Sequence, residues 1–104
     1  MTGCTVIVTL RCEPSDQTEL VSLARDVLPA FARQPGFVSS ALHKSTDGAR
    51  VVNYLRWQSE ADHLACMQSA DVAEAGVGFM AFVEGRKVSI DIGVYDVVET
   101  TEAA

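Results

Sequence analysis

The sequence has no long hydrophobic run and few basic residues. No window of the 104 residues reaches the length of a membrane-spanning helix, and the N-terminus lacks a basic region followed by a long apolar run. Eight Lys and Arg against 14 Asp and Glu give a net charge of −6, which argues against nucleic acids and anionic membranes as partners. We therefore expect a soluble, cytoplasmic protein.

Cysteine and histidine are too scarce, and too far apart, to indicate a metal site. The three cysteines, Cys4, Cys12 and Cys66, form an odd set without CxxC spacing, so neither a disulfide framework nor a zinc knuckle is indicated. Reduced thiols fit best, with Cys66 as a small buried hydrophobe. Two histidines without a third ligand at suitable spacing make a poor metal site. A glycine-rich phosphate loop and a serine nucleophile elbow are also missing.

The residues that are present predict one globular domain over 1–104. An apolar fraction of 48% excludes intrinsic disorder. Runs rich in β-branched residues, or with alternating apolar and polar residues, predict four strands over residues 5–11, 37–45, 51–57 and 87–98. The polar tail at about 100–104 is expected to fray.

Apolar residues at three- and four-residue steps predict the helices between these strands. The first begins at Ser15 or Asp16 with a capping box to Glu19, and Pro29 should kink it or end it early. The apolar stripe of this first helix comprises Leu20, Leu23, Ala24, Val27 and Phe31. The buried side of the second helix is predicted to comprise Leu64 and Ala65, with Met67 as a further candidate. The last helical stripe comprises Val72, Ala75, Phe79, Phe82 and Val83. Ser59 caps the second helix, and Gly85 is the candidate residue after the end of the last.

The order β-α-β-β-α-β predicts an α+β, ferredoxin-like fold. A four-stranded antiparallel sheet covered by helices on one face leaves the other face bare, with apolar side chains on more than one strand. Packing of two such sheets face to face solves this problem, so we expect a homodimer.

The hairpin around Asp47-Gly48 carries the most unusual residue. Alternation places Val51, Asn53, Leu55 and Trp57 on one strand face. An amide beside Leu and Trp is either a satisfied core residue or part of a pocket. If a pocket is present, Asn53 and Trp57, about 13 Å apart, would line its ends, with Leu55 as its floor. Spacing alone favours the core amide.

His43 and His63 are the groups that titrate near neutral pH, so either is a candidate general base. The hairpin register decides whether His43 shares a face with Asn53. A two- or four-residue loop pairs Leu42 with Asn53, whereas a three-residue loop pairs His43 with it. The sequence leaves both open. Phe79 and Phe82, on the last helical stripe, are further candidate pocket residues.

The run from Gly36 to His63 resembles the antibiotic biosynthesis monooxygenase family, and within it the quinone-forming monooxygenases of aromatic polyketide pathways such as the actinorhodin pathway. The residues that carry the resemblance are Pro35-Gly36-Phe37, His43, Ser45-Thr46-Asp47-Gly48, Val51 through Tyr54, Trp57, Ser59 and Glu60.

This resemblance implies a dimeric α/β barrel with a pocket between sheet and helices in each subunit. It implies oxidation of an anthrone- or hydroquinone-like polycyclic aromatic to a quinone by O₂, without flavin, haem or metal. Asn53 and Trp57 would hold the oxyanion, and His43 or His63 would move protons. His63 stands where the family has a tyrosine, and Val77 is near the position of a family arginine, so the base and the substrate stay open.

Three alternatives remain at this stage. A haem-binding or haem-degrading relative is disfavoured because the first strand lacks the asparagine of that branch and its helix tryptophan falls at or near Cys66. A non-enzymatic, dimeric small-ligand binding module would keep the same fold. A polyketide cyclase on the same barrel is the third.

Overall fold

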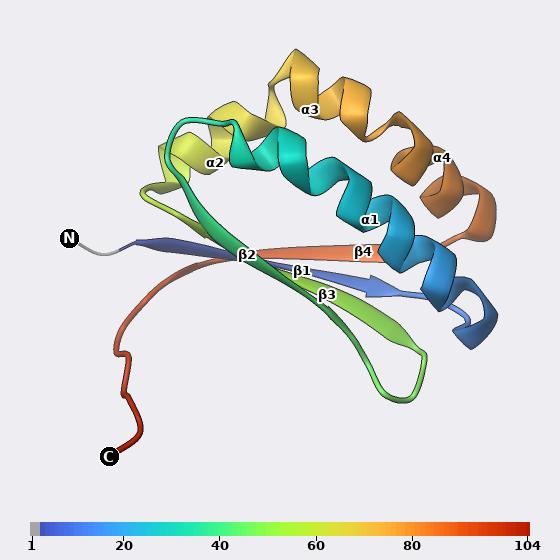
Figure 1. Cartoon of the computed structure of the whole chain (residues 1–104), viewed down its shortest axis with the longest axis horizontal. Coiled ribbons are helices and arrows are strands. Elements are labelled where there is room, and N and C mark those ends of the chain that lie inside the picture. Colours follow the sequence, from blue (N-terminus) through green and yellow to red (C-terminus); the bar gives the residue numbers. More distant parts are fainter. Residues whose placement is uncertain (1–2) are drawn as a thin grey trace.

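A computed structural model describes residues 3–104 as one four-stranded antiparallel sheet with helices packed on it (Figure 1). The strands lie in the order β2-β3-β1-β4, as the predicted ferredoxin-like β-α-β-β-α-β plan requires. This confirms the α+β fold class. The elements are β1 (Cys4–Arg11), a 3-10 turn (Pro14–Asp16), α1 (Gln17–Ala32), β2 (Phe37–Lys44), β3 (Arg50–Trp57), α2 (Glu60–Met67), α3 (Ala70–Ala75), α4 (Val77–Arg86) and β4 (Ser89–Asp96).

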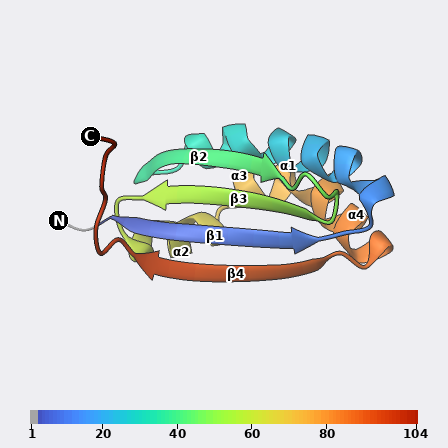
Figure 2. The same cartoon turned by 90° about the horizontal axis from the view of Figure 1, so that it is seen from below.

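All four α-helices lie on one face of the sheet. Figure 1 shows the helices above the strands, and Figure 2 shows the opposite, bare face with the helices behind it. Residues 97–104 follow β4 without regular secondary structure. None of the helices in residues 3–104 is long and apolar enough to cross a membrane.

The hairpin between β2 and β3 has a four-residue loop. Ser45 N–H donates to the Arg50 carbonyl at 2.9 Å, so these residues close the ladder. The Ser45 hydroxyl accepts from Arg50 N–H at 2.8 Å and donates to Asp47 Oδ1 at 2.7 Å, and Gly48 has φ 81°. These bonds hold the pairing of Leu42 with Asn53 and of His43 with Val52. The open question of register is therefore resolved in favour of Leu42.

Helix α1 lacks the predicted capping box and shows one of the two outcomes predicted for Pro29, an early end, to be wrong. Asp16 is the residue before the helix but makes no side-chain cap hydrogen bond, so the predicted capping box does not form. Pro14 opens a 3-10 turn in its place, and Asp16 pairs with Arg86 at 3.7 Å. The helix does not end early at Pro29 but continues to Ala32.

Helices α2 to α4 confirm one cap and correct three details. Ser59 caps α2, as predicted, by accepting from Asp62 N–H at 3.2 Å. The buried side of α2 consists of His63 and Cys66, whereas Leu64, Ala65 and Met67 are exposed. The third predicted stripe is split at Gly76 into α3 and α4. Gly85 lies inside α4, and Lys87, at φ 56°, takes the left-handed position after it.

The core consists of two apolar clusters beneath the helices. One cluster, at the start of β1 and the end of β3, contains Cys4, Val6, Leu55, Trp57 and Cys66. The other, towards the end of β1, contains Leu10, Leu20, Val51, Val83 and Val88. The predicted Val51–Trp57 face is thus the covered face. Cys66 is a buried thiol whose pKa is raised to about 11 by burial, as expected of an inert core cysteine.

Gly36 is a position in the fold where a side chain would be both strained and crowded. It has φ 82°, and an added Cβ would collide with the Asp62 side chain at the start of α2. We expect Gly36→Ala to lower the free energy of unfolding by about 1–3 kcal/mol, measured by urea denaturation. Gly85→Ala is the matched control, because an added Cβ meets no atom within 4 Å there, and a helical alanine should be neutral or stabilising. Equal effects of the two substitutions would contradict this account.

Candidate functional site

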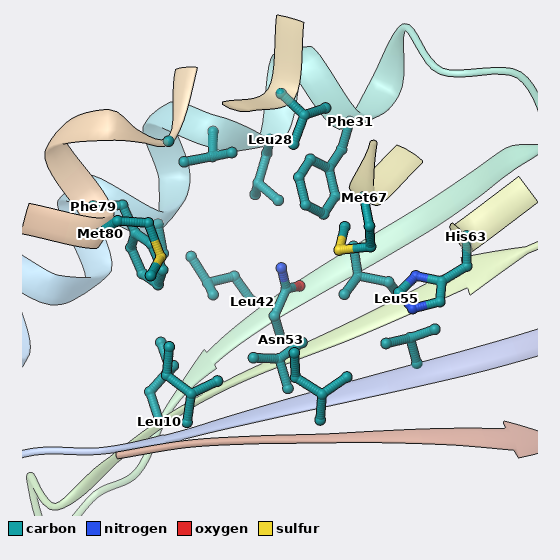
Figure 3. Close-up of a pocket in the computed structure, with 18 of the residues that line it drawn as sticks. Leu10, Leu28, Phe31, Leu42, Asn53, Leu55, His63, Met67, Phe79 and Met80 are labelled. Atoms are coloured by element: carbon teal, nitrogen blue, oxygen red, sulfur yellow. The ribbon is translucent and has the colours of Figure 1, made fainter. Parts of the chain in front are cut away.

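A cavity of about 330 Å³ lies between the covered face of the sheet and the helices. The sheet contributes Val6, Val8, Leu10, Leu42, Asn53, Leu55, Ile90 and Ile92, and the helical layer contributes Ala24, Val27, Leu28, Phe31, His63, Met67, Val72, Ala73, Gly76, Phe79 and Met80. Among these lining residues, Asn53 and His63 carry the only polar side chains (Figure 3). The cavity is within the volume range of small-molecule sites, at its lower end.

Asn53 projects from β3 into the middle of this apolar space (Figure 3). Its strand partners are Val8 on β1 and Leu42 on β2, so its nearest cross-strand neighbours are aliphatic. The side-chain oxygen is buried and has no hydrogen-bond partner within residues 3–104. Buried amides are normally satisfied, and an unpartnered one lining a cavity is suited to bind a polar group of a ligand. The satisfied-core interpretation of Asn53 is therefore not supported.

His63 approaches the same cavity from α2. Its backbone N–H lies in the first turn of the helix and donates to the Ser59 carbonyl at 3.4 Å. The residue is 7% exposed. Burial lowers the pKa of His63 below its ordinary value of 6.5, and the nearby Glu60 carboxylate opposes this only in part. The imidazole is consequently neutral at pH 7, the form that accepts a proton.

The lowered pKa of His63 gives folding a predictable pH dependence. The folded state disfavours the imidazolium, so the stabilisation is complete above pH 6.5 and is lost as the pH falls through the folded-state pKa. We expect wild type to lose stability relative to His63→Gln between pH 7 and pH 5, measured by urea denaturation. His43→Gln, at the exposed histidine, is the control. A constant difference between wild type and His63→Gln across this range would contradict the prediction.

Trp57 does not line the cavity, contrary to the expectation that it and Asn53 lie at its two ends. It is 1% exposed and is enclosed by Phe31, Phe37 and His63, with ring centroids 6.4, 5.3 and 6.2 Å away. Its indole nitrogen is buried without a hydrogen-bond partner in the described chain. Helix α2 closes over this end of β3, so the indole lies behind His63, in contact with the site through that ring.

The other predicted site residues divide between the cavity and the rest of the molecule. Leu55 and Phe79 line the cavity, as expected. Phe82 does not: it packs against the second core cluster, with the Arg86 guanidinium 5.7 Å from its ring centroid. His43 is exposed and pairs with Val52 on the bare face, because the four-residue loop turns it away from Asn53. His43 therefore cannot reach this cavity from its own chain.

Several lining residues were not predicted as part of a site. Phe31 and Val27 belong to the predicted α1 stripe, whose spacing alone does not distinguish a packed core from a cavity wall. Leu42 could have been found only with the hairpin register known. Met67 and Met80 contribute flexible thioethers that adapt to irregular ligand shapes.

The exposed lining residues locate the mouth of the cavity. Met67 and Met80, from the helical layer, are 47% and 44% exposed, and Ile90 and Ile92, from edge strand β4, are 38% and 53% exposed. The helical layer therefore leaves part of β4 uncovered. The mouth lies between these two pairs of apolar side chains.

A metal centre is not formed within residues 3–104, where no group of three or more His, Cys, Asp or Glu side chains could hold an ion. The three described thiols are free. The side chains that line the cavity supply one amide, one neutral imidazole and apolar walls.

Comparison with known families gives one clear match. Residues 4–76 match the model of the family described as "Antibiotic biosynthesis monooxygenase". The matched region runs from β1 to the break at Gly76 and so contains both Asn53 and His63.

Individual relatives are consistent with this match. The tetracenomycin-F1 monooxygenase of Streptomyces glaucescens is 45% identical over 56 residues, 50% of this chain, and the alignment spans 47% of that relative's length. The ActVA-Orf6 monooxygenase of Streptomyces coelicolor, solved with nanaomycin D, is 29% identical with a TM-score of 0.80, covering 99% of this chain and 94% of the other. The cofactor-independent oxygenase SnoaB of Streptomyces nogalater shares the fold, with 20% identity and a TM-score of 0.72, over 96% and 97% of the two chains.

Proposed function

The chain belongs to the antibiotic biosynthesis monooxygenase family, and on that premise we propose that it oxidises an anthrone- or hydroquinone-like polycyclic aromatic of polyketide type to a quinone with O₂, without a cofactor. The observation that carries the proposal is the apolar cavity whose polar side chains are one unpartnered amide and one neutral imidazole. The relative solved with nanaomycin D supports the substrate class, and the name of the cofactor-independent oxygenase supports a reaction without a cofactor.

The first step is removal of a proton from the bound substrate. Neutral His63 accepts it, and the electron pair left behind delocalises onto the substrate oxygen as an enolate. The Asn53 carboxamide donates an N–H to that oxygen, and this bond strengthens as charge develops. The apolar walls exclude water, which would weaken the interaction. His63 and Asn53 thus have separate tasks on the same anion.

The second step transfers electrons from the substrate to O₂. One electron moves from the enolate to O₂, and recombination of the two radicals forms a carbon–oxygen bond and a peroxide. Cleavage of the O–O bond then leaves a carbonyl on the ring, and the second oxygen atom departs as water with the two hydrogens of the oxidised carbon. One O₂ is consumed for each methylene converted to a carbonyl, and no external reductant is needed.

The test is turnover of an anthrone such as emodin anthrone by purified, chelator-treated protein under air. We expect oxygen uptake and quinone formation above the buffer blank, with one atom of ¹⁸O from ¹⁸O₂ in the new carbonyl. Uptake no faster than the blank, with hydroquinones equally inert, would count against the proposal. A Soret band on haem titration would favour the haem-binding alternative, and a product without added oxygen would favour a cyclase.

We also propose that the protein is a homodimer through the bare face of the sheet (Figure 2). By strand register this face carries Ile7, Val52, Tyr54 and Tyr95, and the two tyrosines are 39% and 51% exposed. Paired sheets would remove this apolar surface from water. Light scattering should give twice the chain mass, and Tyr54→Lys should shift it towards the monomer. A monomeric wild type would contradict the proposal.

A further inference from the structure

We propose that the cavity selects an uncharged aromatic and excludes one that carries a carboxylate, and that Met80 at the mouth is a residue that sets this selectivity. This proposal rests on the proposed function for the reaction, but it concerns binding and is tested by binding as well. It narrows the substrate to a phenolic polycycle without an ionised substituent.

The first argument is the absence of a cation among the described residues that line the cavity. None of these residues is Lys or Arg, and His63, whose pKa is lowered by burial, is neutral at pH 7. Two surface arginines are engaged elsewhere: Arg33 forms a two-pronged ion pair with Asp71, and Arg86 pairs with Asp16. A carboxylate entering the cavity would lose its hydration and gain no counter-charge.

The second argument concerns the path into the cavity. The exposed lining side chains are two methionines, two isoleucines and one alanine, Ala73, so the mouth is apolar on both sides. An ionised group that stays at the mouth therefore also finds no cationic partner there. The net charge of −6 adds an unfavourable long-range field for an anion.

The third argument identifies Met80. It lines the cavity and is 44% exposed, so one end of its side chain reaches solvent. A long cationic side chain at this position would keep its charge in water while reaching an anionic substituent at the mouth. Met80→Arg should therefore relax the selectivity, whereas Met80→Gln, polar but neutral, should not.

The binding experiment compares two quinones that differ by one carboxylate, 1,8-dihydroxyanthraquinone and rhein, by quenching of the single tryptophan at pH 7. We expect rhein to bind about 100-fold more weakly to wild type. In Met80→Arg the ratio of the two affinities should shrink by about tenfold or more, and in Met80→Gln it should stay near the wild-type value. If Met80→Arg does not fold, Met67→Arg is the replacement variant, because Met67 is the other exposed methionine at the mouth of the cavity.

Turnover is then compared for the matching anthrones, 1,8-dihydroxyanthrone and its carboxylated analogue rhein anthrone. Weak binding of rhein together with inert anthrones would uphold the selectivity and contradict the proposed oxidation. Affinities for the two quinones within about threefold of each other would overturn the selectivity, whatever the turnover. Failure of the uncharged 1,8-dihydroxyanthraquinone to bind would overturn it as well. If the ratio of the affinities for the two quinones is the same in Met80→Arg and Met80→Gln, the proposed role of Met80 is wrong.

Discussion

Asn53→Leu should lower turnover of an anthrone by about 10²–10³-fold without lowering the stability of the fold. The loss of rate follows from removal of the donor to the developing oxyanion, for which this is the usual magnitude. The unchanged or improved stability follows because the substitution removes a buried acceptor without a partner and leaves an apolar side chain between Val8 and Leu42. Steady-state kinetics and urea denaturation of the same preparations provide the two measurements.

This pair of measurements separates a functional amide from a structural one. If Asn53 were a core residue hydrogen-bonded to its neighbours, leucine at this position would lower the free energy of unfolding by about 1–3 kcal/mol, because the hydrogen-bond partners would be left unpaired. Leu42→Ala is the matched control, since it alters the cavity wall directly beside Asn53 without removing a polar group. It should lower stability and affect the rate less than Asn53→Leu. A destabilised Asn53→Leu with unchanged turnover would reject the assignment.

Trp57→Ala should destabilise the protein by about 3–5 kcal/mol, the usual range for removing a fully buried aromatic side chain. The indole is 1% exposed and is part of the cluster that joins the start of β1 to α2, packed edge-to-face on Phe37. For a domain of this size, such a loss is a large fraction of the total stability. Thermal and urea denaturation check it, and a loss below about 1 kcal/mol would contradict the packing described.

Trp57→Phe distinguishes this structural role from contact with the substrate. Phenylalanine retains most of the packing but lacks the N–H, which has no partner among the described residues. Because Trp57 lies behind His63 and does not line the cavity, we expect Trp57→Phe to change the pH profile of turnover through His63. It should leave the distinction between charged and uncharged ligands intact, measured by titration calorimetry because this variant contains no tryptophan. A loss of turnover equal to that of Asn53→Leu, with no change in pH profile, would indicate direct contact.

The shared face of Val51, Asn53, Leu55 and Trp57 on β3 could be predicted because successive side chains of a strand point to opposite faces of the sheet. The register of β3 could not be predicted, because Asp47-Gly48 is compatible with more than one loop length. The hydrogen bonds of Ser45 to Arg50 and Asp47 decide it. The same register places His43 beside Val52 on the bare face of the sheet, away from the cavity.

The helices show where periodicity was insufficient. Successive residues of a helix point about 100° apart, and α2 has only eight residues, so too few apolar positions fix which side is buried. The buried side of α2 consists of His63 and Cys66, and this orientation places His63 in the lining of the cavity. The position of Trp57 behind that histidine depends on how α2 closes over β3, a tertiary contact with no counterpart in local spacing.

The uncovered part of β4 has a consequence for self-association. Ile90, Ile92 and Val94 are exposed along an edge strand whose backbone has one free side, an arrangement that favours addition of a further strand and growth of aggregates. Asp91 and Asp96 lie on the same strand, and charges of this kind oppose such pairing. Neutralising them should raise the tendency to precipitate near the isoelectric point. The uncovered stretch of β4 at the mouth of the cavity thus also favours self-association at high protein concentration.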